Sequence, residues 1–252
     1  LLDAIHAAFD LSRCLEFTVE GGRADTLTLE KLQVIRRGGA DRMSINPQTM
    51  NDKTLLGVGR KHTVEDIRRV FREAREEGHE NINMDLILGL PGENAEDVRN
   101  TMEEIMKLDP DNVTVHTLAV KRASRLREEL DQHDMTTAET LESMLNIAAE
   151  YAEKMGMEPY YMYRQKNTVG NLENVGFSLE GCEGRYNIYM MEEIHSIFAL
   201  GAGAVSKYVS KDRTRIERSF CPKYPYEYLR EDKNMAFREA ALKFYREHGM
   251  LD

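Results

Sequence analysis

Two acidic residues occupy positions where a parallel sheet binds ligands. Glu20 ends the segment LEFTVE at 15–20, and two glycines follow it. Asp85 lies inside the apolar run INMDLIL at 82–88, which we expect to be a strand buried on both faces. An ionised carboxylate there is costly unless it has partners. We predict that Glu20 accepts a ligand ammonium group and that Asp85 binds a ligand at the mouth of the sheet. The alternatives are a solvated strand end and a turn-capping carboxylate.

Two further polar residues follow the next predicted strand. Gln48 comes after DRMSIN at 41–46, and Arg60 follows the glycines of LLGVGRKHT. Taken alone, each residue fits a structural or solvated role. Because the carboxyl ends of parallel strands meet at one edge of a sheet, one site could collect both residues together with the acids.

The segment PYYMYRQKN combines aromatic and cationic side chains. Tyr161 and Tyr163 stand beside Arg164 and Lys166. Aromatic faces next to cations suit a flat anionic ligand, so these four residues are our candidates for substrate binding. A core strand that ends in a solvated basic turn is the alternative.

The elements that must position these residues alternate between strand and helix. Helices are expected after the capping residues Thr28, Thr63 and Asn94. Successive βα units with short turns imply parallel strands and right-handed crossovers. An open doubly wound sheet and a barrel both satisfy this pattern. The expected strands lie at 15–20, 41–46, 82–88 and 112–118.

The pattern changes after about residue 125. A helix is predicted at 137–155, followed by the tyrosine-rich segment, a strand and turn in ALGAGAVSK, and a last helix near 233–248. We therefore divide the chain into an α/β part at 1–125 and an α+β part at 126–252.

Composition excludes several classes of protein. The chain of 252 residues has 34 Lys and Arg against 44 Asp and Glu, a net charge of −10, which argues against a nucleic-acid binder. No apolar run reaches the length of a membrane helix. Cys14, Cys182 and Cys221 form no metal-binding spacing and no disulfide framework. We expect a cytoplasmic protein.

Four segments together resemble the radical S-adenosylmethionine (SAM) family of oxygen-independent coproporphyrinogen III oxidases. They are EFTVEGG, RMSINPQTMNDKTLLGVGRKHT, NINMDLILGLPGE and ALGAGAVSK. The run YMYRQKNTVGNLENVG is most similar to the coproporphyrinogen dehydrogenase branch. The resemblance implies a partial (β/α)6 barrel that contains only the later strands, with an α+β C-terminal extension acting as a substrate lid.

The resemblance also implies roles for individual residues. Glu20 would bind the amino group of SAM, and Gly203 and Ala204 would press against the adenine or the substrate. The ribose and carboxylate of SAM would be bound by Gln48, Arg60 and Asp85.

The reaction implied by the resemblance requires a [4Fe–4S] cluster and an electron donor. SAM is cleaved reductively to a 5′-deoxyadenosyl radical, which removes a hydrogen from a propionate side chain. Loss of carbon dioxide and an electron leaves a vinyl group. Two such steps convert coproporphyrinogen III to protoporphyrinogen IX.

The chain departs from the family at one important point. The family binds its cluster through a C-x-x-x-C-x-x-C loop, and this sequence contains none. We therefore expect a C-terminal fragment that is inactive by itself. Two alternatives remain. One is a haem chaperone, although that branch has a histidine where this chain has Tyr186. The other is an unrelated parallel α/β enzyme acting on phosphates or carboxylates.

Overall fold

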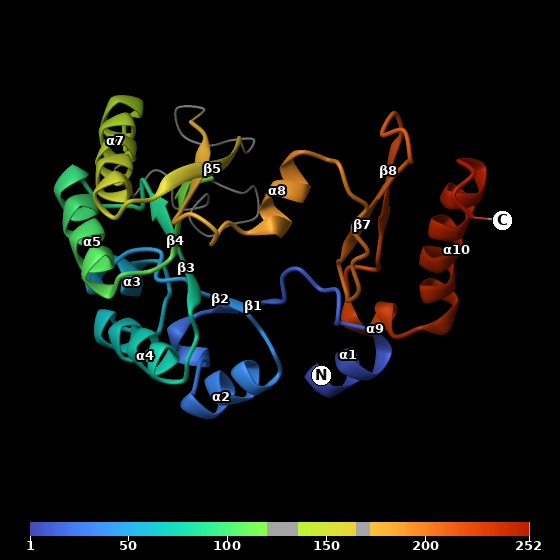
Figure 1. The fold of residues 1–252 in the computed structure, drawn as a ribbon. Coiled ribbons are helices and arrows are strands. Elements are labelled where there is room, and N and C mark those ends of the chain that lie inside the picture. The colour runs from blue at the N-terminus through green and yellow to red at the C-terminus, as the bar shows by residue number, and fades with distance from the viewer. Residues whose placement is uncertain (120–135, 165–171, 252) are drawn as a thin grey trace. The chain divides into compact units, whose positions relative to one another are not determined.

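The computed structural model describes residues 1–119, 136–164 and 172–251 (Figure 1). These residues form two compact units, Leu1–Arg185 and Tyr186–Asp252. The predicted division between residues 125 and 126 lies outside the described residues.

The first unit is built on a six-stranded sheet. Its first four strands are parallel, as the alternating pattern predicts. The fifth strand in spatial order is antiparallel to its neighbours on both sides. The α/β fold class is thereby confirmed. In spatial order the strands are β1 (Thr18–Gly22), β2 (Arg42–Ile45), β3 (Asn81–Leu88), β4 (Asn112–Thr117), β6 (Asn174–Ser178) and β5 (Glu158–Tyr163).

The helices between the parallel strands begin at the predicted caps. Thr28 accepts a hydrogen bond from the backbone of Lys31, while Thr63 and Asn94 each form a reciprocal capping box with an aspartate three residues later. These caps satisfy backbone donors that the first turn leaves unpaired. The unit contains η1 (Ala24–Thr26) and the helices α1 (Leu2–Ala8), α2 (Leu29–Arg37), α3 (Asp52–Gly57), α4 (Val64–Glu76), α5 (Ala95–Leu108) and α7 (Ala138–Lys154).

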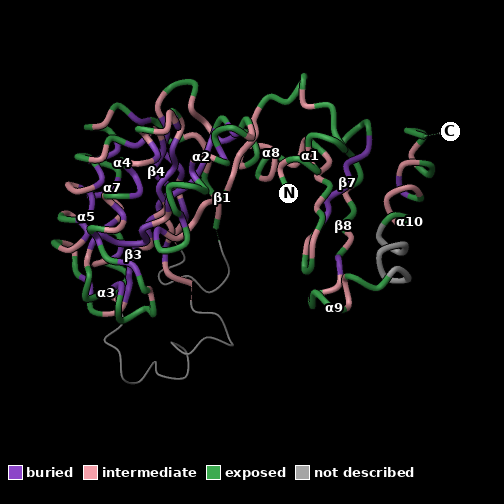
Figure 2. The backbone as a smooth tube through the Cα atoms, turned by 90° about the horizontal axis from the view of Figure 1, so that it is seen from below, coloured by how far each residue is buried: buried purple, intermediate pink, exposed green. Residues whose placement is uncertain are grey.

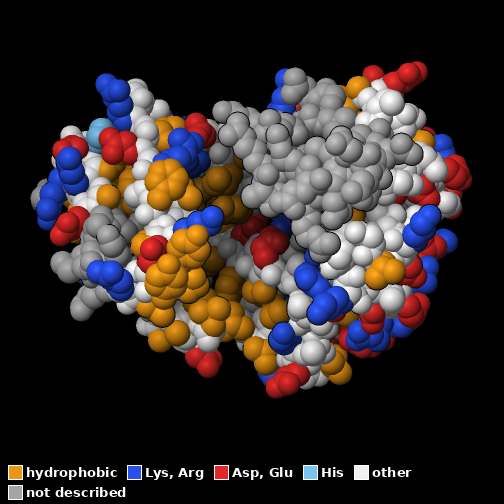
Figure 3. All heavy atoms as spheres, turned by 180° about the vertical axis from the view of Figure 1, so that it is seen from behind, with side chains coloured by type: hydrophobic (Ala, Val, Ile, Leu, Met, Phe, Trp, Pro, Cys, Tyr) orange, Lys and Arg blue, Asp and Glu red, His pale blue; other side chains and the backbone are white. Residues whose placement is uncertain are grey.

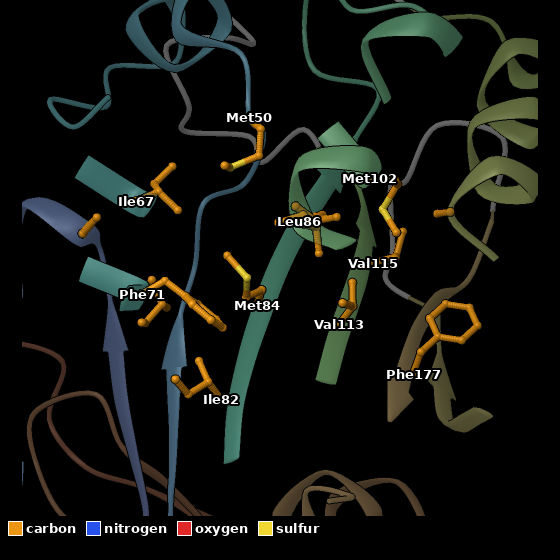
Figure 4. Packing of buried hydrophobic residues seen from close by; sticks show 14 of the residues in the cluster. Met50, Ile67, Phe71, Ile82, Met84, Leu86, Met102, Val113, Val115 and Phe177 are labelled. Carbon is orange, nitrogen blue, oxygen red and sulfur yellow. The ribbon is translucent and has the colours of Figure 1, made fainter. Parts of the chain in front are cut away.

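The hydrophobic core lies between the helices and one face of this sheet. Met84 of β3 and Val113 of β4 point toward Phe71 of α4 and Met102 of α5 (Figure 4). Figure 2 shows buried residues gathered along β3 and β4. Burying this apolar surface contributes most of the favourable free energy of folding, at about 25 cal/mol for each Å².

The opposite face of the sheet is polar. The register places Ser44, Asn83 and Thr114 on this face, with Asp85 and His116 further along their strands. We expected the strand around Asp85 to be buried on both faces. Its core-facing residues are buried, and on the polar face Asn83 is buried while Asp85 is half-buried. Alternate residues point to opposite sides of a strand, and here only the even-numbered residues of β3 enter the core.

The second unit has its own small aromatic core. Tyr208 packs against Phe244, with ring centroids 5.7 Å apart, and also contacts Phe198 and Tyr245. The predicted strand in ALGAGAVSK and the last helix are both present. The elements are β7 (Val205–Val209), β8 (Ile216–Phe220), α9 (Pro225–Tyr228) and α10 (Glu231–Glu247), and α8 (Arg185–Met191) begins at the division between the units.

Figure 3 shows Lys and Arg side chains interspersed with Asp and Glu side chains on part of the visible surface, and hydrophobic side chains gathered elsewhere on it. On the helices of the first unit, Arg68 pairs with Glu65 at 3.3 Å and with Glu104 of the next helix at 2.5 Å. None of the described helices combines the length and apolar composition that crossing a bilayer requires.

Candidate functional site

Glu20 lies on the polar face of β1. It pairs in register with Ser44 of β2, whose Oγ donates a 2.6 Å hydrogen bond to Glu20 Oε2. The strand extends two residues beyond Glu20 instead of ending there. The following Gly21 is required by close packing, because a Cβ atom at that position would lie 2.7 Å from the Ser44 carbonyl oxygen.

Asp85 lies on the same polar face, on β3. Asn83 Nδ2 donates to Asp85 Oδ1 at 2.7 Å, and His116 Nε2 lies 3.8 Å from Asp85 Oδ2. Thr114 in turn donates to Asn83 Oδ1 at 3.1 Å. The Asp85 side chain remains 23% exposed, so its carboxylate has neighbours that orient it and still reaches solvent.

Gln48 extends the edge of β2 alongside β3. Its backbone N–H donates to the backbone carbonyl oxygen of Asp85 at 3.0 Å, and its own carbonyl oxygen accepts from the backbone N–H of Ile87 at 2.9 Å. Its φ of 71° is uncommon for a residue other than glycine. The side chain is buried, with Nε2 3.4 Å from the Asn46 carbonyl.

The turn that carries Gln48 is tied to the loop after β3. Thr49 donates a 2.6 Å hydrogen bond to the buried carboxyl group of Glu93 and lies 3.3 Å from the hydroxyl of Thr101. Burial raises the pKa of Glu93 above its ordinary value, although the threonine hydroxyls oppose this shift. Glu93 therefore stabilises two adjacent loops at the carboxyl edge of the sheet.

Arg60 follows α3 and lies near the charged residues Arg23 and Asp25, which follow β1. Burial and the positive charge of Arg23 lower the pKa of Arg60, and Asp25 opposes that effect. Asp25 accepts a 2.6 Å bond from Arg23 and lies 3.4 Å from the buried His62. The bond from Arg23 is the main cause that lowers the pKa of Asp25 to about 2. Arg60 thus belongs to a charged cluster beside the strand that carries Glu20.

The predicted tyrosines form an aromatic wall at the antiparallel edge. The rings of Tyr161 and Tyr163 are stacked, 6.1 Å apart and 5° from parallel. Tyr161 packs directly over Gly176 of β6, where a Cβ atom would lie 1.9 Å from its ring. Burial raises the pKa of the Tyr161 hydroxyl, and its hydrogen bond with Thr114 opposes this. The wall therefore adjoins the polar face through Thr114.

The remaining predicted residues have surroundings of their own or lie outside the described part of the chain. Arg164 is exposed and pairs with Glu173 at 2.5 Å, and Lys166 lies outside the described residues. Gly203 and Ala204 form a turn before β7 in the second unit, where Gly203 donates to the carbonyl of Pro222 at 2.8 Å. Their contact with a ligand stays a prediction.

Sequence reasoning missed several polar residues of the site. Ser44, Asn83, Thr114 and His116 line the same face as the two acids. Among the described residues, the buried Asn46 Oδ1 and Asn174 Nδ2 have no hydrogen-bond partner. Every second residue is polar in β2, in β4 and in β3 as far as Asp85, and this period of two was the available signal. Such unpaired buried groups suit a polar ligand.

The cysteines of this chain do not fit an iron–sulfur cluster. Ligation requires thiolates, yet burial raises the pKa of both Cys182 and Cys221. Cys14 is exposed and donates to the backbone of Glu16. Within the described part of the chain, no group of three His, Cys, Asp or Glu side chains could hold a metal ion.

The polar face, in contrast, fits a molecule that carries an ammonium group and hydroxyls. Glu20 and Asp85 supply carboxylate acceptors, and Asn46 and Asn174 supply unpaired amide atoms. SAM has an amino group, a carboxylate and ribose hydroxyls.

Comparison with known proteins identifies the family. The chain is 45% identical over 219 residues to the oxygen-independent coproporphyrinogen-III oxidase-like protein HemZ of Bacillus subtilis, covering 87% of this chain and 44% of that protein. Residues 4–105 match the radical SAM superfamily. The chain therefore contains a radical SAM domain. The predicted recognition is confirmed.

Other relatives of this radical SAM chain divide between two activities. It is 31% identical over 219 residues to the heme chaperone HemW of Bacillus subtilis, covering 85% of this chain and 53% of that protein. The solved structure of coproporphyrinogen III oxidase (HemN) from Escherichia coli has the same fold, with a TM-score of 0.65 and 17% identity, over 88% of this chain and 50% of that one. The chain spans about half the length of the relatives that it matches.

Proposed function

We propose that this chain supplies the SAM-binding face and part of the substrate site of a radical SAM oxidoreductase acting on coproporphyrinogen III. The observation that carries the proposal is the pair of carboxylates, Glu20 and Asp85, held by Ser44 and Asn83 on one polar sheet face. Parallel barrels bind ligands toward the carboxyl ends of their strands. Glu20 and Asp85 lie two and three residues before the ends of β1 and β3.

Different residues of the chain would bind different groups of SAM. Glu20, already oriented by Ser44, accepts hydrogen bonds from the ammonium group of SAM. Asp85 accepts bonds from hydroxyl groups, and Arg60 provides a positive charge for the SAM carboxylate. SAM, when bound next to a [4Fe–4S] cluster, supplies the one-electron chemistry, and the protein supplies orientation and shielding from water.

The coproporphyrinogen site is proposed at the aromatic wall. Tyr161 and Tyr163 offer stacked rings beside the polar face, and Arg164 follows them in the chain. A tetrapyrrole with four propionates needs cations, so Arg164 and Lys166 remain the proposed partners of its carboxylates. The similarity to HemZ supports this substrate class.

Calorimetric titration of the chain with SAM and with coproporphyrin III tests the two binding sites separately. We expect Glu20→Gln to weaken SAM binding by about tenfold or more, since a charge-assisted hydrogen bond contributes roughly 1.5–3 kcal/mol. Cys14→Ser serves as a control with unchanged affinity. An affinity for SAM that is unchanged when either Glu20 or Asp85 is replaced by its amide would contradict the proposal. The complete reaction is measured in a protein that joins this chain to the C-x-x-x-C-x-x-C loop.

A haem chaperone is the second candidate, because HemW proteins are also similar to this chain. Haem titration followed by its Soret absorption separates the two functions. We expect no stoichiometric haem complex with wild-type protein. A complex that survives gel filtration would favour the chaperone instead.

A further inference from the structure

His116 connects two parts of the site that are otherwise separate. It lies on the polar face of β4, and its Nε2 is 3.8 Å from Asp85 Oδ2. On the other side of the ring, Nδ1 is 3.1 Å from the hydroxyl oxygen of Tyr163. Neither the motifs of the sequence nor the proposed binding of SAM requires a histidine here.

The contact with Tyr163 selects one tautomer of the imidazole ring. A phenol is protonated at neutral pH and readily donates, and a neutral imidazole has one donor nitrogen and one acceptor nitrogen. When Tyr163 donates to Nδ1, the ring proton must reside on Nε2. That proton then faces Asp85.

The second oxygen of the Asp85 carboxylate is the group that His116 can reach. Oδ1 already accepts from Asn83 at 2.7 Å, whereas Oδ2 lies beyond the usual hydrogen-bond length of about 2.7–3.2 Å from Nε2. A movement of less than about 1 Å would complete the bond. Catalytic hydrogen bonds commonly shorten in this way when a ligand binds.

We propose that His116 is a positioning residue, which Tyr163 holds in the Nε2–H tautomer so that it fixes the Asp85 carboxylate when SAM binds. The inference rests on the proposed function, because it takes Asp85 as a SAM-binding group. It also couples the cofactor site to the aromatic wall, since Tyr163 stacks on Tyr161. A substrate that shifts Tyr163 on binding to the aromatic wall would therefore also shift His116, and with it the carboxylate of Asp85.

The tautomer can be tested without any ligand. Long-range ¹H–¹⁵N correlation spectra distinguish a protonated Nε2 from a protonated Nδ1, and His116→Gln identifies the signals of this residue. We expect the Nε2–H form in the wild-type protein and a mixture of tautomers in Tyr163→Phe. A wild-type ring protonated at Nδ1 would overturn the proposal.

The coupling to Asp85 is tested by a double-mutant cycle in the full chain, with S-adenosylhomocysteine as the titrated ligand. We expect His116→Ala to weaken binding about three- to tenfold, the loss of one hydrogen bond, and His116→Gln to restore part of it. In an Asp85→Asn background the same change should have less than about a twofold effect, because the partner carboxylate is gone. The control His6→Ala should not alter affinity.

The outcomes separate this inference from the proposed function. If His116→Ala lowers the affinity equally in the wild-type and the Asp85→Asn proteins, the positioning role is overturned, but the proposed SAM site is not. A wild-type protein that binds no S-adenosylhomocysteine at all overturns the proposed function and this coupling with it. Circular dichroism of each variant checks that the fold is retained, and a merely structural role for His116 would lower stability without the dependence on Asp85.

Discussion

The hydroxyl of Ser44 donates a 2.6 Å hydrogen bond to the carboxylate of Glu20 across the first two parallel strands. The donor is fixed, because Ser44 is fully buried on a strand that has paired neighbours on both sides. Glu20 therefore presents its remaining lone pairs in one orientation before any ligand arrives. Such preorganisation lowers the entropy cost of binding.

Replacing Ser44 by alanine should weaken SAM binding about three- to tenfold, because Glu20 loses the hydrogen bond that orients it, worth roughly 1 kcal/mol net. Isothermal titration calorimetry measures the change. Ser12→Ala, on an exposed loop, is the matched control. Unchanged affinity in Ser44→Ala would mean that Glu20 is oriented by other groups.

Gly176→Ala should destabilise the first unit by about 1–3 kcal/mol, because the new methyl group overlaps the ring of Tyr161. Urea unfolding followed by circular dichroism measures the loss. Gly57→Ala is the matched control, since a Cβ atom at Gly57 in α3 meets nothing within 4 Å. That control should be neutral or slightly stabilising.

The origin of the Gly176 effect can be checked with a second variant. When Tyr161→Ala removes the ring, adding Gly176→Ala should cost much less than it does alone. Strictly additive effects would show that the glycine is needed for backbone conformation instead of space.

Glu93→Gln should stabilise the protein at pH 8 by about 1 kcal/mol, because the glutamine avoids the cost of ionising a buried carboxyl group while still accepting from Thr49. The sign follows from the raised pKa. The folded state holds its proton more tightly than the unfolded chain, so wild-type stability falls as pH rises above the ordinary value of 4.5. The difference in the free energy of unfolding between variant and wild type, measured by urea unfolding, should become smaller below that pH. A larger difference in the free energy of unfolding in acid would contradict a raised pKa of Glu93.

Asp25 should contribute stability that disappears in acid. Its pKa is lowered from 3.8 to about 2, so the contribution is present above pH 3.8 and is lost as pH falls toward 2. Because the pair with Arg23 is partly exposed, we expect a contribution of only about 1 kcal/mol. Comparing urea unfolding of wild type and Asp25→Asn between pH 2 and 5 isolates this effect from other carboxylates. Parallel curves for the two proteins would contradict it.

Glu173 should compete with an anionic substrate for Arg164. The two side chains form a 2.5 Å pair that is partly exposed to solvent. Glu173→Gln should therefore strengthen binding of coproporphyrin III about three- to tenfold, and Arg164→Ala should weaken it by a similar factor. Fluorescence titration of the porphyrin measures both. If neither variant changes the affinity, Arg164 lies outside the substrate site.

The sequence by itself determined the order of the elements and the places where helices begin. Thr28, Thr63 and Asn94 are recognisable as caps because capping depends on residues within one helical turn. The positions of Glu20 and Asp85 near the carboxyl ends of parallel strands were also predictable, since strand direction follows from the βα repeat.

Only the tertiary structure decided which polar residues share a face and which cations are already paired. The contacts of Ser44 with Glu20 and of His116 with Tyr163 join residues that are 24 and 47 positions apart, so they depend on strand register. The pairing of Arg164 with Glu173 likewise depends on the strands β5 and β6 lying side by side. The register is set by the packing of the whole sheet against its helices. That packing joins residues far apart in the sequence, so a local pattern does not determine it.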